Sequence, residues 1–367
     1  MEDRTATIPL TPFLEDLEAR IDPEVEEGLE RAWRRFTLEG WPDPVFAPAR
    51  PALNPSRLDW PAISVNRALA DGDAMALQQL GMCSRLLAAG GGNLMMVRCN
   101  YGTGLLPSLF GAELYVMDEA TNTLPTTRPL AGGAETMRRL VARGMPDLRT
   151  GLGGRVFEMT ERFQSLLAPY PKLSRFVSLY HPDLQGPMDV AELLWGSSLF
   201  LAIVDEPELV HETLALITDT YIAFLRAWER QVPPRDSAVS LHWGWMHRGR
   251  VMLRDDSAMN LSPAMYEAFI RPYDQRILDA FGGGAIHFCG RGDHYIGAMT
   301  ASRGLHAIAM SQPELNDMEI IYRNTVDRGV RLLGLPLEEV RRAQAAGRPL
   351  RGYVHCDDPS RRPVAAR

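Results

Sequence analysis

The sequence is short of lysine, cysteine and long apolar runs, and each shortage excludes a class of protein. Of 39 basic residues only Lys172 is a lysine, so a Schiff-base mechanism is excluded at every other position. Four cysteines in 367 residues are too few for a disulfide framework, and we therefore expect a reducing, cytoplasmic setting. There, a cysteine beside a histidine is expected to bind a metal or to remain inert.

Neither a targeting segment nor a nucleic-acid surface is expected. The first 20 residues lack the charged-then-apolar pattern of a signal peptide, and no run of about 18 consecutive apolar residues could span a membrane. The net charge is −7, without a clustered basic arm, which argues against binding to nucleic acid. A hydrophobic content of 46% and a charged content of 23% are typical of a soluble globular protein with a sizeable core.

The N-terminal part has its own character. Residues 12–40 show the pattern of acidic, amphipathic helix, and residues 41–61 then contain six prolines. Because proline lacks a backbone donor, the second stretch cannot form regular helix or a central strand. We expect residues 1–61 to form a helical and proline-rich extension that wraps over the main body, since the segment is too short for its own core.

From residue 62 onward, helical and strand-like segments alternate. The strands are short and apolar on both faces, as in parallel strands that helices cover. This pattern predicts a (β/α)8 TIM-type barrel over residues 62–367, with an open doubly wound sheet as the alternative. No G-x-G-x-x-G follows an early strand, which weakens the alternative. The predicted strands near the C-terminus are 285–290, 305–310, 330–335 and 351–357.

Two longer helices are predicted before these strands. Residues 205–232 have helical periodicity with Pro207 in the first turn, and residues 262–284 begin on Ser-Pro and end in glycines. Serine before the helix and proline in its first turn are typical N-terminal signals, and glycine is a typical stop.

A histidine and a cysteine lie two residues apart at the end of a predicted strand. Residues i and i+2 of a strand point to the same face, so His287 and Cys289 can converge on one ion. Cys356 ends the strand at 351–357, and a barrel brings strand ends to the same mouth. One histidine and two thiolates with an open fourth position are the ligands of a catalytic zinc site. The alternative is a buried strand cysteine beside a hydrogen-bonded histidine.

The order of motifs around this pair resembles a known family. Residues 254–296 contain an aspartate-rich loop, a Ser-Pro helix start, a Pro-Tyr pair near mid-helix and H-x-C-G. This order resembles the uroporphyrinogen decarboxylase superfamily, especially its cobalamin-dependent methyltransferase branch. Residues 100–125 and 186–218 are similar to further blocks of the family.

The resemblance implies a fold, a cofactor and a partner. It implies a TIM-type barrel in which His287, Cys289 and Cys356 bind Zn²⁺. It further implies methyl transfer between a small methylated substrate, or a thiol or folate acceptor, and a corrinoid (cobalamin) carried by a partner protein; dimers are common in the family. The R-Q-A-G-R-type motif of true decarboxylases is absent. A metal-independent decarboxylase and a non-catalytic tetrapyrrole- or corrinoid-binding barrel remain the alternatives.

Three further residues are candidates for catalysis. Asp255 and Asp256 precede the helix that starts at Ser262, where they could contact substrate or act as a general base; the alternative is a solvated capping loop. His242 ends a predicted strand beside Trp243 and could bind substrate or supply a fourth ligand, or simply pack among aromatic rings.

Four polar or aromatic residues at strand ends are candidates for lining the cofactor pocket. Asn100 and Tyr101 close an early strand, and Gln312 and Asn316 follow the strand at 305–310. In a barrel all of these positions lie near the carboxyl ends of strands, where ligands bind.

Overall fold

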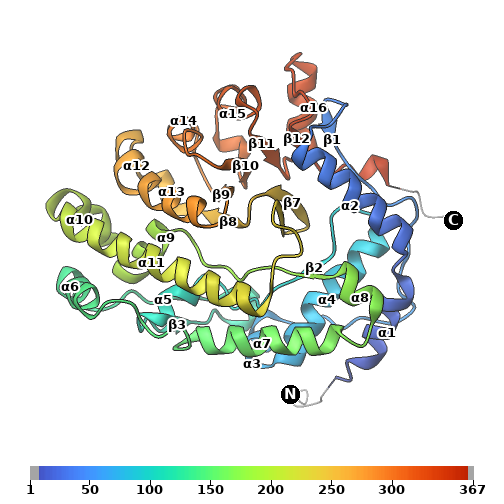
Figure 1. Cartoon of the computed structure of the whole chain (residues 1–367), viewed down its shortest axis with the longest axis horizontal. Helices are drawn as coiled ribbons and strands as arrows, with labels where there is room; N and C mark the ends of the chain where they lie inside the picture. The colour runs from blue at the N-terminus through green and yellow to red at the C-terminus, as the bar shows by residue number, and fades with distance from the viewer. Residues whose placement is uncertain (1–7, 363–367) are drawn as a thin grey trace.

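The computed structural model describes residues 8–362, in which helices and short strands alternate along the chain (Figure 1). The strands are β1 (Val45–Phe46), β2 (Met96–Val97), β3 (Leu114–Tyr115), β4 (Thr126–Thr127), β5 (Ser178–Leu179), β6 (Val239–His242), β7 (Trp245–Arg248), β8 (Val251–Arg254), β9 (Gly284–Phe288), β10 (Leu305–Met310), β11 (Arg331–Leu333) and β12 (Val354–His355). The helices are α1 (Thr11–Arg20), α2 (Pro23–Leu38), α3 (Val65–Ala70), α4 (Gly72–Ala89), α5 (Leu105–Leu109), α6 (Gly133–Arg143), α7 (Leu152–Leu167), α8 (Pro171–Phe176), α9 (Pro187–Trp195), α10 (Leu199–Asp205), α11 (Pro207–Gln231), α12 (Pro263–Phe269), α13 (Arg271–Ala280), α14 (Ile296–Met299), α15 (Met318–Asn324) and α16 (Leu337–Ala345).

The main sheet is parallel, with the order β1-β12-β11-β10-β9-β8. Strands β2 and β5 form a separate parallel ladder, and β6 and β7 form an antiparallel hairpin. The predicted alternation of parallel strands and helices is therefore confirmed. The predicted closed ring of eight strands is not seen within residues 8–362, because no ladder joins the β2–β5 pair to the six-stranded sheet.

Alternate residues of the central strands face two different clusters of apolar side chains. On β9 and β10, Ile286 and Ile308 belong to the larger cluster, which the helices contribute to. Ala285 and Ala309 belong to the smaller cluster, together with Met246 of β7. Figure 1 shows helices α12 to α16 outside the arc of strands β8 to β12, and β7 inside it. Since strand side chains alternate, His287 faces the inner side, as Ala285 does.

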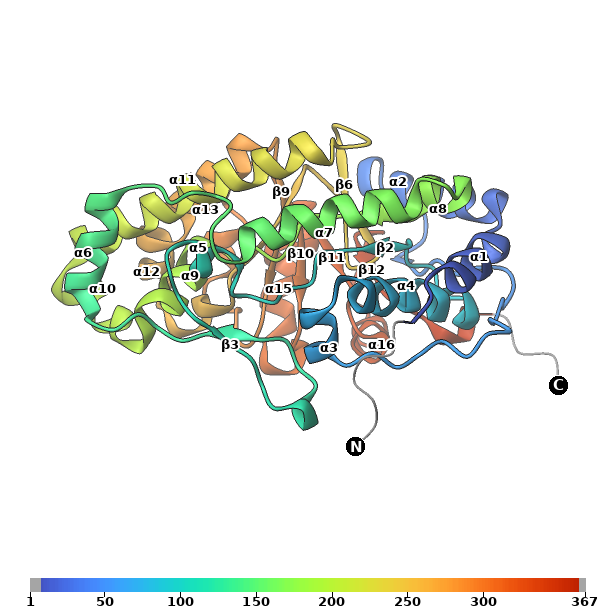
Figure 2. The same cartoon turned by 90° about the horizontal axis from the view of Figure 1, so that it is seen from below.

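Two long helices, α7 and α11, lie on the side of the molecule opposite strands β9 to β12 (Figure 1). The predicted helix at 205–232 is confirmed as α11, which starts at Pro207. Figure 2 shows α7 running beside α11. The Gln231 side chain donates to the Phe157 carbonyl at 3.0 Å, and the Gln164 side chain donates to the Gln231 carbonyl at 2.8 Å. Both bonds involve Gln231, the last residue of α11, and they tie this end of α11 to α7.

One described segment has the length and composition of a membrane span. It covers Pro187–Asp205, with a mean hydropathy of 1.4, and 56% of it is buried inside the structure. Asp189 and Glu192 interrupt its apolar residues, and Asp189 makes buried hydrogen bonds to the protein. The segment therefore has the burial of a core helix.

The predicted helix at 262–284 is divided into α12 and α13. The Ser262 side chain caps its start by accepting from the Met265 amide, as predicted. Pro272 then interrupts the helix because proline lacks an N–H and clashes with the preceding turn. It stands in the first turn of α13, where the missing donor is not needed.

The proline-rich passage supplies the edge of the main sheet. Its strand β1 has two residues and pairs with β12, as expected for an edge strand flanked by prolines. The preceding residues form α1 and α2 rather than one helix, because Asp22 caps a new helix that begins at Pro23. The described part of the extension, residues 8–61, thus contributes β1 to the sheet of the main body.

Candidate functional site

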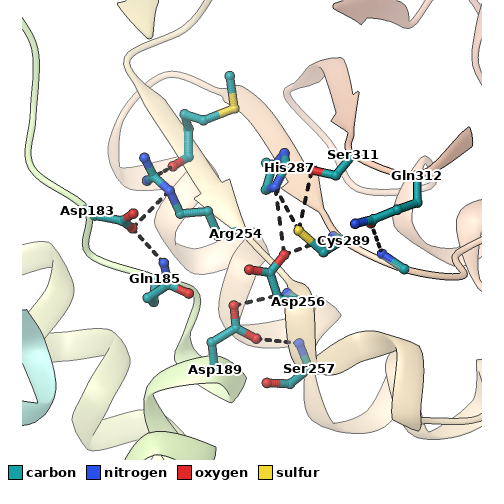
Figure 3. Close-up of polar contacts among 12 residues, drawn as sticks. Asp183, Gln185, Asp189, Arg254, Asp256, Ser257, His287, Cys289, Ser311 and Gln312 are labelled. Atoms are coloured by element: carbon teal, nitrogen blue, oxygen red, sulfur yellow. Dashed lines mark hydrogen bonds and ion pairs between the residues drawn. The ribbon is translucent and has the colours of Figure 1, made fainter. Parts of the chain in front are cut away.

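Three potential metal ligands converge where β8 and β9 end (Figure 3). They are His287 of β9, Cys289 just after it, and Asp256 two residues beyond β8. One ligand atom from each lies within 4.8 Å of the other two. The pairing of Arg254 with His287 explains the convergence, because it places the residues that follow both strands side by side.

The spacing of these atoms fits a single tetrahedral ion. The Cys289 sulfur is 3.4 Å from His287 Nε2, and His287 Nε2 is 3.8 Å from Asp256 Oδ1. Zinc–sulfur bonds of about 2.3 Å and zinc–nitrogen bonds of about 2.1 Å place neighbouring tetrahedral ligands roughly 3.5 Å apart. The donor set of thiol, imidazole and carboxylate also suits zinc.

Burial controls the charge of His287 and Cys289. It lowers the pKa of His287, although the nearby Asp256 carboxylate opposes this effect, so the imidazole is neutral and can bind a metal. Burial also raises the pKa of the Cys289 thiol to about 11, and the hydrogen bond with Ser311 only partly offsets it. Without a bound cation the thiol therefore stays protonated at neutral pH.

Asp189 of α9 fixes the loop that presents Asp256. Its carboxylate accepts from the Asp256 amide at 3.0 Å and from the Ser257 amide at 2.7 Å. The Asp256 carboxylate in turn accepts from the Cys289 amide at 2.8 Å. The loop after β8 and the loop after β9 are thereby held at a fixed separation.

Gln312 and Asn316, which were predicted to line the pocket, hold the loop after Cys289. Gln312 accepts from the Gly290 amide at 2.6 Å. The Asn316 side chain accepts from the amides of Gly292 and Asp293 and donates to the Gly290 carbonyl. Both side chains thus support the backbone that carries the cysteine, and their contact with a cofactor stays a prediction.

Replacing Asn316 by alanine is expected to weaken zinc binding by about 10–100-fold, the usual effect of removing a group that orients a ligand. Competition with a chromogenic chelator measures this affinity. Asn324→Ala is the control, because the Asn324 side chain donates to the Ile320 carbonyl of the same helix, α15, and to no other group within residues 8–362. An equal affinity in Asn316→Ala and wild type would show that the loop needs no such support.

Cys356 does not join the group of Asp256, His287 and Cys289 in this structure. At the end of β12, His355 packs against Trp33 and Trp245, whereas the next residue, Cys356, lies in the larger, helix-side cluster. The charged groups that affect its thiol are Asp357, Asp358, Arg341 and Arg361, of which Arg341 belongs to α16. The geometry therefore places Asp256 where the sequence predicted Cys356.

Asp255 and Asp256 are neighbours with different environments. Asp255 is buried and accepts from the Tyr266 hydroxyl at 3.1 Å, whereas Asp256 belongs to the ligand group. Burial raises the pKa of Asp255 from 3.8 to about 7, although the hydrogen bond from the Tyr266 hydroxyl opposes the rise. Asp255 therefore faces helices α12 and α13 rather than the ligand group.

This raised pKa predicts a pH-dependent contribution to stability. The folded chain binds the Asp255 proton more tightly than the unfolded chain, so stability is lost as pH rises from about 4 to about 7. We expect Asp255→Asn to reduce this loss, because the amide does not ionise. Urea unfolding of both proteins between pH 4 and pH 8 measures the difference, and parallel pH profiles would contradict the assignment.

His242 ends β6, as predicted, but lies within a cluster of buried rings. Its Nδ1 is 2.7 Å from His247 Nε2, and its ring centroid is 4.2 Å from that of His181. Burial lowers its pKa well below the usual value. The structure does not place His242 in the ligand group. Its surroundings are those expected if His242 packs among aromatic rings.

The tip of the β6–β7 hairpin brings two tryptophans to the site. Trp243 and Gly244 have φ values of 51° and 87°, as a two-residue hairpin turn of this hand requires. For a bulky residue such as Trp243 this conformation is strained and costs on the order of 1–3 kcal/mol. Trp245 packs directly against Gly334. A Cβ atom added at Gly334 would lie 2.2 Å from the Trp245 ring and would clash with it.

A cavity of about 320 Å³ adjoins the imidazole of His287. Its walls are mainly apolar and aromatic, with a few polar groups, as in small-molecule sites. The lining residues are Trp243, Trp245, His287, Ala309, Met310, Ser311, Gly334 and Pro336.

Asn100 and Tyr101 follow β2, as predicted. The Asn100 side-chain oxygen is buried and has no hydrogen-bond partner within the described chain. The Tyr101 ring is buried beneath the Arg155 guanidinium, which lies 4.6 Å from its centroid. Their role in cofactor binding stays a prediction.

Sequence reasoning missed three charged residues near the site. Asp189 stands in the first turn of α9 after Pro187, where an acidic residue is an ordinary helix start. Asp183 and Arg254 form a buried ion pair at 2.9 Å. An arginine at the end of an apolar strand was the available signal for this pair, because a buried charge needs a partner.

Comparisons with known proteins support the fold. No protein-family model and no curated protein matched the chain. Among solved structures, its fold is similar to that of a methyltransferase from Methanosarcina mazei. The two share 16% sequence identity with a TM-score of 0.57, over 82% of this chain and 84% of that chain. At this identity the likeness is one of fold.

Proposed function

We propose that the protein is a zinc-dependent methyltransferase with a TIM-type barrel of the uroporphyrinogen decarboxylase superfamily. It would transfer a methyl group between a small methylated substrate, or a thiol or folate acceptor, and a corrinoid on a partner protein. The observation that carries the proposal is the convergence of Asp256, His287 and Cys289 beside a cavity. The similar fold of a methyltransferase from Methanosarcina mazei is a second support.

In this proposal Asp256, His287 and Cys289 hold the ion, and Ser311 lies against the cysteine sulfur. Bound zinc lowers the pKa of a coordinated thiol, so that a thiolate is available at neutral pH. Asp189 and Asn316 keep the loops that carry the ligands in place. Trp243 and Trp245 line the cavity beside His287, and such apolar walls would reduce the access of water to the reacting groups.

Methyl transfer to a thiol has a simple electron balance. The thiolate sulfur forms the new bond to the methyl carbon, cobalt keeps both electrons of the cobalt–carbon bond, and the thiol proton passes to solvent. The exposed side of the ligand group, where the Asp256 side chain is 40% exposed, is open to such reactants.

Free methylcobalamin and 2-mercaptoethanol provide a direct assay. Zinc-loaded protein is expected to convert them into cob(I)alamin and the S-methyl product, measured by absorbance and mass spectrometry. Protein stripped of zinc and Cys289→Ala are expected to form neither product. Equal turnover by the stripped protein would rule the proposal out, and porphyrinogen consumption by it would favour the decarboxylase alternative.

A further inference from the structure

Trp243 has a strained backbone conformation at the tip of the β6–β7 hairpin. Its φ of 51° lies in the left-handed region, which bulky residues rarely adopt. Asparagine, aspartate or glycine is the usual residue at this position of a two-residue hairpin turn. Such strain persists where the surrounding structure holds a residue in place, and it is typical of functional sites. The strain therefore indicates a function for the Trp243 side chain.

The hairpin tip that carries Trp243 is held by the segment before β2. The Leu94 amide donates to the Gly244 carbonyl at 2.8 Å, and the Gly244 amide lies 2.9 Å from the Met96 sulfur. A Cβ atom added at Gly244 would lie 2.7 Å from that of Asn93. These contacts keep the turn, and with it the indole, in one place.

The indole of Trp243 stands between a buried charge and the cavity. The Arg254 guanidinium carbon lies over the indole, 4.8 Å from its centroid. The His287 ring lies 5.0 Å from the indole, between centroids. Trp243 lines the cavity, whereas Arg254 does not line it and is only 1% exposed. A molecule in the cavity therefore meets the indole and not the guanidinium.

The cavity itself offers no charged partner to an anion. Apart from the ligand His287, the residues that line it are uncharged. The Arg254 guanidinium is already paired, with its Nε 2.9 Å from Asp183. In the proposed zinc site, the Asp256 carboxylate and the Cys289 thiolate balance the charge of the ion. Because a charge without a partner is costly to move from water into an apolar site, the cavity favours an uncharged molecule.

We propose that Trp243 is a specificity-determining residue, which shields Arg254 from the cavity and thereby selects a small, uncharged substrate with an apolar body. This inference rests on the proposed function and specifies the class of its substrate. The apolar part of the substrate packs against Trp243, Trp245 and Met310, and its reacting group lies on the side of His287.

Benzamide and benzoate, which have nearly the same shape but differ in charge, test the inference without turnover. Ligand-observed NMR titrations at constant ionic strength give their affinities for the whole chain before zinc is loaded, so that benzoate cannot bind the ion instead. We expect benzamide to bind roughly tenfold or more tightly than benzoate, because the cavity offers the carboxylate no charged partner. Equal affinities, tighter binding of benzoate, or no binding of benzamide would overturn the inference.

Substitutions at Trp243 separate a shield from a purely structural tryptophan. Trp243→Asn suits the turn, because asparagine accepts a positive φ, and it opens the wall in front of Arg254. It should lower the preference for benzamide by roughly tenfold or more, since benzoate can then accept charge-assisted hydrogen bonds from the guanidinium. Trp243→Phe is the matched control, because it keeps an aromatic wall and should keep the preference.

Combining Trp243→Asn with Arg254→Gln shows whether the gain for benzoate comes from the guanidinium, and this double variant should restore the preference for benzamide. An unchanged preference in Trp243→Asn, or a gain for benzoate that persists in the double variant, contradicts the inference. If the preferences are as expected but the zinc-loaded protein forms no methylated product, only the proposed function fails.

Discussion

Replacing Cys289 by alanine is expected to lower the affinity for zinc by more than about 100-fold, beyond the usual effect of losing a supporting group. Cys289 is the one sulfur in the ligand group, and thiolate is the ligand that most favours zinc over harder ions. The same substitution should abolish methyl transfer from methylcobalamin. Elemental analysis after dialysis and chelator competition measure the loss of zinc.

Cys356→Ala is the matched control for this prediction. Cys356 has the same chemistry and was predicted to be a ligand, but it is buried in the helix-side cluster. Its replacement should leave one zinc per chain and a nearly unchanged zinc affinity. If the loss of zinc is as large in Cys356→Ala as in Cys289→Ala, the ligand group described above is wrong.

Replacing Glu26 by glutamine is expected to destabilise the fold by about 3–5 kcal/mol, the typical cost of breaking a buried ion pair. Glu26 of α2 accepts two hydrogen bonds from Arg50, at 2.8 and 2.6 Å, and both side chains are 3% exposed. Arg50 also donates to the carbonyls of Gly91 and Asn93. The pair therefore joins the N-terminal extension to the segment that leads into β2.

Glu30→Gln is the control for the stability measurement. Glu30 lies on the same helix and pairs with Arg175 at 2.7 Å, but the two side chains are 30% and 50% exposed. Such an exposed pair contributes less than about 1 kcal/mol. Urea unfolding of both variants compares the effects, and equal losses of stability would show that the extension is not anchored through Arg50.

Much of the fold could be predicted because its signals are local. The apolar runs of β9 and β10 and the capped start of α12 follow directly from their own residues. The β6–β7 hairpin could not be placed, because its position inside the arc of strands depends on contacts such as the packing of Trp245 at Gly334. The closure of strands into a ring likewise depends on register between distant segments.

The candidate site, too, could be predicted only in part. His287 and Cys289 share a face because strand side chains repeat every two residues, so their pairing could be predicted. The same alternation turns Cys356 away when His355 faces inward, and a shift of one residue decides between the two faces. Asp256 approaches His287 because of the register between β8 and β9. The sequence does not specify this register.

X-ray absorption at the zinc edge identifies the ligands of the metal, because it counts the sulfur atoms bound to zinc. With Asp256, His287 and Cys289 as ligands, zinc-loaded wild-type protein should show one sulfur at about 2.3 Å and otherwise nitrogen or oxygen neighbours at about 2.0–2.2 Å. Cys356→Ala should give the same spectrum. Two sulfur neighbours in wild type, reduced to one in Cys356→Ala, would contradict the account.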